Sequence, residues 1–212
     1  MKINRIVLIA AAVVLWSCNN GSTNTGALSG ESDTAKECCK NEKQNASGNA
    51  IPEESVFNIT SRWKDQDEHV FQLRDLSGSI TVTAMIFTSC QSACPQIMGD
   101  IKNIESGLNA DMQKNVRFLL ITMDPEHDTP ERLKAFMKEH QLNYKWSLIS
   151  SDNDATMEMA NVLGVRIKKL SDGGFDHSNA VFVINRNGVI EHKQDGLGQD
   201  PGGTIKAISS LL

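Results

Sequence analysis

Two cysteines four residues apart, Cys90 and Cys94, carry the most specific chemistry in this sequence. They lie between an apolar run rich in β-branched residues and a segment that Pro95 opens as a helix. A helix N-terminus offers unpaired N–H groups and the positive end of the helix dipole, and both favour a thiolate over a thiol. A thiolate is a nucleophile and also a soft metal ligand. The pair therefore indicates redox or metal chemistry, and we prefer this to an inert disulfide, because structural bridges more often clamp distant elements.

The elements that must position this pair follow from the hydrophobic pattern. Apolar, β-branched runs predict buried strands, and Thr129 followed by Pro130 predicts the start of a helix. Asn187 and Gly188 predict a hairpin turn between the last two strands. The order predicts a mixed α/β sheet with helices on both faces, a thioredoxin-like layout with an N-terminal β-hairpin. The expected strands are 56–59, 70–73, 80–87, 116–123, 146–149, 165–168, 180–184 and 189–192, and the expected helices are 95–108, 130–140, 152–163 and 204–212.

The sequence resembles one family in several separated motifs. These are the segment 87–95 around the cysteines, the segment 122–133, the triplet 176–178 and the dipeptide 187–188. Together they are similar to the Sco/SenC copper proteins, over roughly residues 54–212. The resemblance implies a thioredoxin-like fold and a role in assembling the dinuclear copper centre of respiratory oxidases.

The resemblance implies that Cys90, Cys94 and His177 are copper ligands. His177 follows a Gly173-Gly174 loop and precedes a predicted strand. By resemblance to thioredoxin-like enzymes, this segment carries a cis-proline facing the cysteines, and here it contains none, so an imidazole has room on that side. Two thiolates and an imidazole suit a soft monovalent ion such as Cu(I). A lone histidine is ordinarily a surface or packing residue, and only the resemblance reverses that interpretation.

Two carboxylates are candidates for orienting a ligand. Asp124 ends a predicted strand and precedes Pro125, so it either supports the site or caps a loop. Asp176 adjoins His177 and is the weaker candidate. We expect the other histidines to be solvated, and most methionines fall in helix or strand patterns that indicate core packing.

The start of the chain predicts export. Lys2 and Arg5 precede an apolar run at 6–16, which is too short to span a bilayer as a helix. The run therefore indicates a signal peptide at residues 1–17. The Ser17-Cys18 ending resembles a bacterial lipobox, with Cys18 as the lipidated residue. Trp16 is atypical there, and the alternative is an ordinary signal peptide with a nearby free cysteine.

The segment 18–53 is polar, without hydrophobic periodicity, and we expect a flexible tether between lipid and domain. This predicts a lipid-anchored protein of the bacterial cell envelope, with its domain facing the periplasm or the cell exterior. Cys38 and Cys39 lie in the tether; they either capture soft metal or are incidental, and we favour the incidental interpretation. The formal net charge is −5 and no Lys/Arg run occurs, so nucleic acid is not an expected partner.

Two functions compete on this reasoning. The first is a copper metallochaperone that serves a copper-site apoprotein such as a cytochrome oxidase subunit. The alternative is a thiol-disulfide oxidoreductase that keeps the cysteines of such a client reduced. A peroxide-reducing enzyme is disfavoured, because Thr88 is present but no arginine lies near Cys90 in the sequence.

Overall fold

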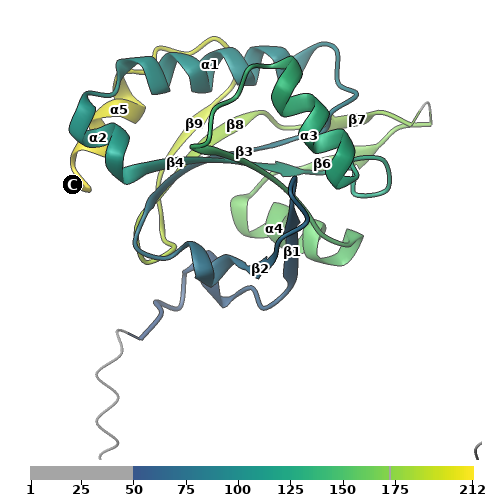
Figure 1. Ribbon diagram of the computed structural model, residues 1–212, viewed down its shortest axis with the longest axis horizontal. Helices are drawn as coiled ribbons and strands as arrows, with labels where there is room; N and C mark the ends of the chain where they lie inside the picture. The colour runs from purple at the N-terminus through teal and green to yellow at the C-terminus, as the bar shows by residue number, and fades with distance from the viewer. Residues whose placement is uncertain (1–49, 172) are drawn as a thin grey trace, which may run out of the picture. The chain divides into compact units, whose positions relative to one another are not determined.

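A single mixed sheet organises the part of the chain that the computed structural model describes, residues 50–171 and 173–212. Seven strands lie in the order β2-β1-β5-β4-β3-β8-β9 (Figure 1). The central strands are parallel, β1, β8 and β9 are antiparallel to their inner neighbours, and β2 is antiparallel to β1. The prediction of a thioredoxin-like mixed sheet with an N-terminal hairpin is confirmed. The strands are β1 Arg62–Asp65, β2 Val70–Gln72, β3 Ile80–Ile86, β4 Val116–Thr122, β5 Trp146–Ser150, β8 Ala180–Ile184 and β9 Ile190–Asp195.

Helices cover both faces of this sheet. In Figure 1, α1, α3 and α5 lie on one side of the sheet and α4 on the other. The connections β3-α1-β4 and β4-α3-β5 join parallel neighbours in the same direction across the sheet, and their common right-handedness places α1 and α3 on the same face. The helices are α1 Ala93–Gly107, α2 Ala110–Asn115, α3 Pro130–Glu139, α4 Asn153–Leu163 and α5 Gly202–Ser209.

The core lies between these layers, and it explains the composition of the central strands. Every residue of β3 is buried, as expected for a strand with both faces covered. Phe118 of β4 stacks on Trp146 of β5 with ring centroids 4.7 Å apart. The predicted cap of α3 is present, because the Thr129 side chain accepts a hydrogen bond from the Arg132 N–H.

Near the N-terminus of the domain, the predicted strand 56–59 is wrong, and the predicted strand 70–73 is one residue too long. Residues Val56–Asn58 form a 3₁₀ helix, η1, and the first strand of the hairpin is β1. The reason is local: the Ser55 hydroxyl accepts a hydrogen bond from the Phe57 N–H, and Val56 and Phe57 are both buried although they are consecutive. A strand that is buried on one face would alternate instead. Leu73 belongs to a second 3₁₀ helix, η2 Leu73–Leu76.

The segment before β8 also differs from expectation. Strands β6 Ile167–Lys169 and β7 Phe175–His177 pair antiparallel as a separate two-stranded sheet, so His177 lies on a strand and not in a loop. Helix α1 begins two residues before Pro95, and the short helix α2 was not predicted.

The predictions about export concern residues outside the described part of the chain. The signal peptide 1–17, Cys18, Cys38 and Cys39 all lie there, and they stay predictions. Across residues 50–171 and 173–212, none of the helices has the length and apolar character that crossing a bilayer requires.

Candidate metal centre

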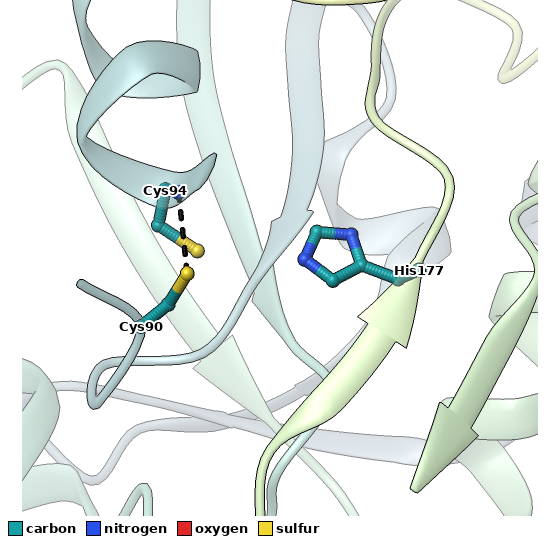
Figure 2. Close-up of side chains that lie close together, drawn as sticks. All are labelled: Cys90, Cys94 and His177. Atoms are coloured by element: carbon teal, nitrogen blue, oxygen red, sulfur yellow. Dashed lines mark hydrogen bonds between the residues drawn. The ribbon is translucent and has the colours of Figure 1, made fainter. Parts of the chain in front are cut away.

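The structure brings Cys90, Cys94 and His177 together at the carboxyl end of β3 (Figure 2). Cys90 lies in the turn that follows the strand, where its N–H donates to the Phe87 carbonyl at 3.2 Å. Cys94 lies in the first turn of α1, and His177 ends β7. One ligand atom from each side chain lies within 4.8 Å of the other two. Three segments that are distant in sequence therefore converge on a volume that fits one metal ion.

Cys90 is the accessible thiol of the pair. It is partly buried, and its Sγ accepts a hydrogen bond from the Cys94 N–H at 3.4 Å. Burial alone would raise the pKa of the Cys90 thiol, but hydrogen bonds from the backbone N–H groups of Cys94, Ser92 and Ala93 outweigh it, so the net pKa is lowered. These donors are the free N–H groups at the start of α1, as the sequence predicted. Cys90 is therefore the thiol that ionises first.

Cys94 is the inner thiol, with a relative exposure of 1%. Burial raises its pKa strongly, and the proximity of Cys90 and of the Asp128 carboxylate adds to the rise. A proton on Cys94 is therefore retained until a cation or an electrophile replaces it.

His177 presents one ring nitrogen to the cysteines. Its Nδ1 lies 3.3 Å from the Ser178 carbonyl, so Nδ1 carries the proton in this arrangement and Nε2 keeps its lone pair. Figure 2 shows that the ring nitrogen farther from the His177 backbone faces the two sulfur atoms. Burial lowers the pKa of His177, which favours the neutral imidazole that metals bind. The Phe87 ring packs against the imidazole edge to face, at 5.9 Å between centroids.

The two candidate supporting carboxylates differ in their surroundings: Asp124 has a hydrogen-bond partner, and Asp176 lines the same surface hollow as Cys90 and His177. Asp124 is buried and both its oxygens lie within 3.0 Å of His127 Nδ1. Asp176 is exposed, and it faces Lys168 across the β6-β7 ladder. Within the described residues neither carboxylate hydrogen-bonds Cys90, Cys94 or His177.

Asp124 instead belongs to a second cluster, with Glu126 and His127. Their ligand atoms also lie within 4.8 Å of one another. Glu126 pairs with Lys169 of β6 at 2.9 Å, and His127 pairs with Asp124. This donor set is mostly oxygen and already has partners, so it does not suit a soft ion as the cysteine site does.

A buried network beneath the cysteine turn was missed from the sequence. The Asp128 carboxylate accepts hydrogen bonds from the Thr88 N–H at 3.1 Å and from the hydroxyls of Thr88 and Thr122. Arg132 donates from Nε to the Thr88 hydroxyl at 3.0 Å. The network holds the residue two positions before Cys90. Thr88 and Asp128 are 40 residues apart, and no spacing rule predicts such a contact.

Comparison with known proteins identifies the family to which this sequence and fold correspond. The model of the family SCO1/SenC matches residues 52–212. The SCO1 protein homolog of Bacillus subtilis is 22% identical over 143 residues, which cover 66% of this chain and 74% of that protein.

Solved structures show the same fold. A SCO1/SenC family lipoprotein from Bacillus anthracis superposes with a TM-score of 0.64 at 24% identity, covering 71% of this chain and 91% of that chain. Bradyrhizobium japonicum ScoI with copper bound gives a TM-score of 0.61 at 21% identity, covering 72% of this chain and 97% of the other. Since the family match extends over nearly all of the described residues, this chain belongs to the SCO1/SenC family.

Proposed function

We propose that this protein is a copper metallochaperone that holds Cu(I) through Cys90, Cys94 and His177. One observation carries the proposal: two sulfur atoms and an imidazole nitrogen converge within 4.8 Å of one another at a partly open site. Two soft thiolates select Cu(I) over hard cations, and the imidazole completes a three-donor set. The copper-bound structure of Bradyrhizobium japonicum ScoI supports the same choice of metal.

The accessibility of the site supports a protein that delivers copper to a recipient over one that retains it permanently. Cys90 and His177 are each only partly buried, and both line a surface hollow of about 400 Å³. Ligands of a recipient protein can therefore approach the copper while Cys94 still holds it from the inside. We propose that the recipient is a copper-site apoprotein such as a cytochrome oxidase subunit.

We also propose that the domain works at the envelope surface, attached through lipid on Cys18 and the tether that follows. The resemblance of Ser17-Cys18 to a lipobox supports this, and so does the Bacillus anthracis relative, which is described as a lipoprotein. Radiolabelled palmitate tests it: label should enter the wild-type chain in a bacterial host and be absent from Cys18→Ala. Equal labelling of both chains would contradict the assignment.

A competition titration tests the metal site. The reduced full chain, with Cys18, Cys38 and Cys39 replaced by serine, is titrated with Cu(I) against a chromophoric chelator, beside its His177→Ala and His192→Ala variants. We expect one tight equivalent, weakened at least about tenfold by His177→Ala, since a lost metal ligand costs more than the 1.4 kcal/mol that corresponds to tenfold. His192→Ala should bind as the parent does. Weak Cu(I) binding that is the same in the parent and in His177→Ala would refute the copper assignment.

The unequal thiols support a second candidate function, thiol-disulfide reduction of a client. The Cys90 thiolate attacks the client disulfide and forms a mixed disulfide, while one client sulfur leaves as a thiolate. Cys94 loses its proton and attacks Cys90 Sγ, which gives a Cys90–Cys94 disulfide and releases the second client sulfur as a thiolate. The client gains two electrons and the protein is oxidised by two.

Replacing Cys94 tests the reductase function, because Cys94 carries out the second step, in which the client is released. Cys94→Ser should accumulate the mixed disulfide with an oxidised peptide that carries a Cys-x-x-x-Cys pair, and His177→Ala should reduce the peptide at the parent rate. If Cys94→Ser forms no adduct, the reductase function fails, and the copper titration is unaffected by that outcome.

A further inference from the structure

A cationic hollow lies near the amino ends of the central strands β3, β4 and β5, at the opposite end of these strands from the cysteines. Its volume is about 680 Å³. It is lined by Ser79, Ala110, Gln113, Lys114, Asn115, Val116, Arg117, Tyr144, Lys145 and Ser147. Three of these residues are cationic and none is acidic, although the whole chain has a net charge of −5. The charge of the hollow is therefore opposite to that of the chain.

Arg117 is the central feature of the hollow. It is the second residue of β4, is half-buried, and donates from one terminal nitrogen to the Ser79 hydroxyl at 2.8 Å. Burial lowers the pKa of Arg117, yet a guanidinium stays charged in a protein. Among the described residues no carboxylate pairs with it. A half-buried guanidinium with one neutral partner retains N–H groups that can donate hydrogen bonds to a phosphate or carboxylate group.

The neighbouring cations strengthen this arrangement. Lys145 precedes β5, and its ammonium donates to the Gln113 amide oxygen at 3.3 Å with no ion pair in the described part of the chain. Lys114 is exposed and pairs with Asp111, which is itself largely exposed. Two of the three cations thus lack an acidic partner, and the polar side chains between them offer further hydrogen bonds.

We propose that this hollow binds a phosphate or carboxylate group of a small anion, held by Arg117 and Lys145. The volume falls in the range of small-molecule sites, about 300–1,000 Å³. Arginine binds both groups with two parallel N–H bonds, and lysine adds a point charge. The hollow and the cysteines lie at opposite ends of β3, whose 7 residues span roughly 20 Å. The anion site is therefore separate from the proposed copper site.

Calorimetric titration of the metal-free full chain tests the proposal. The probes are pyrophosphate and citrate at constant ionic strength, and they distinguish phosphate from carboxylate recognition. We expect saturable one-to-one binding of at least one probe. Arg117→Gln should weaken it about tenfold or more, and Lys145→Gln several-fold, because each removes a charge-assisted hydrogen bond. Lys206→Gln, which removes an exposed cation of α5, should bind as the parent does.

Three results would overturn the proposal. The first is no saturable heat with either probe, and the second is equal binding by the parent, Arg117→Gln and Lys145→Gln. The third is tight binding of an acidic peptide that neither small anion displaces, which would make the hollow a surface for a protein. Lys145→Gln keeps the test valid if the loss of the Ser79 contact unfolds Arg117→Gln. The Cu(I) affinity of correctly folded variants should be unchanged, so failure here leaves the copper proposal standing.

Discussion

Replacing Phe87 with leucine should weaken copper binding through His177 alone. Phe87 is 6% exposed, and its ring packs edge to face against His177 and, at 5.1 Å between centroids, against Phe175. Leucine keeps most of the buried apolar volume, so the domain should stay folded with a cost of up to about 1.5 kcal/mol. The imidazole loses the ring that fixes its orientation.

The expected size of the effect follows from one aromatic contact. Such a contact contributes about 0.5–1.5 kcal/mol beyond its buried area. Cu(I) affinity should therefore fall about two- to tenfold in Phe87→Leu, measured by chelator competition. Phe182→Leu is the matched control, because Phe182 is 1% exposed in β8 and, among the ring contacts of the described residues, pairs with Lys193 and not with His177.

A double-mutant cycle makes the test specific. In the His177→Ala background Phe87→Leu should change the Cu(I) affinity very little, because the residue that it orients is gone. If Phe87→Leu weakens binding equally in both backgrounds, or if Phe182→Leu weakens it as much, Phe87 does not act through His177 and the reasoning is refuted.

Three further predictions concern the thiols, pH and the last hairpin. Iodoacetamide at pH 7 should alkylate Cys90 and spare Cys94, since the pKa of Cys90 is lowered and that of Cys94 raised; mass spectrometry showing equal labelling would contradict this. Burial lowers the pKa of His177, so the folded state resists its protonation, and stability should fall as pH drops below about 6.5, less steeply in His177→Ala. Parallel slopes in chemical denaturation would refute that assignment. Gly188→Ala should destabilise more than Gly78→Ala: both have positive φ, costing about 1–2 kcal/mol, but a Cβ at Gly188 also meets the Phe57 ring at 2.7 Å. Equal melting temperatures would refute the packing argument.

The sequence predicted those parts of the fold whose signals are local. Seven consecutive buried residues in β3 need both faces covered, and the sequence shows this as a β-branched and apolar run in which Thr81 and Thr83 are the only polar residues. Thr129 and Pro130 mark a helix start by their own side chains. The cysteine pair was found because its spacing, four residues, keeps it within one turn.

The features of the fold and of the site that the sequence did not predict depend on contacts between segments that are distant in the chain. Strand β7 has only three residues and no buried one, so it has no hydrophobic pattern, and pairing with β6 defines it. His177 has no spacing partner in the sequence, and only the family resemblance made it a candidate ligand. The contact of Asp128 with Thr88 depends on the adjacency of β3 and β4. Such contacts follow from the tertiary structure and not from local propensity.

X-ray absorption at the copper edge tests the central claim most directly. The Cu(I)-loaded chain, with Cys18, Cys38 and Cys39 replaced by serine, should show two sulfur scatterers and one nitrogen scatterer with the multiple-scattering pattern of an imidazole. His177→Ala should lose the imidazole pattern and keep both sulfurs. A sulfur-only spectrum that is identical in the parent and in His177→Ala would contradict the site.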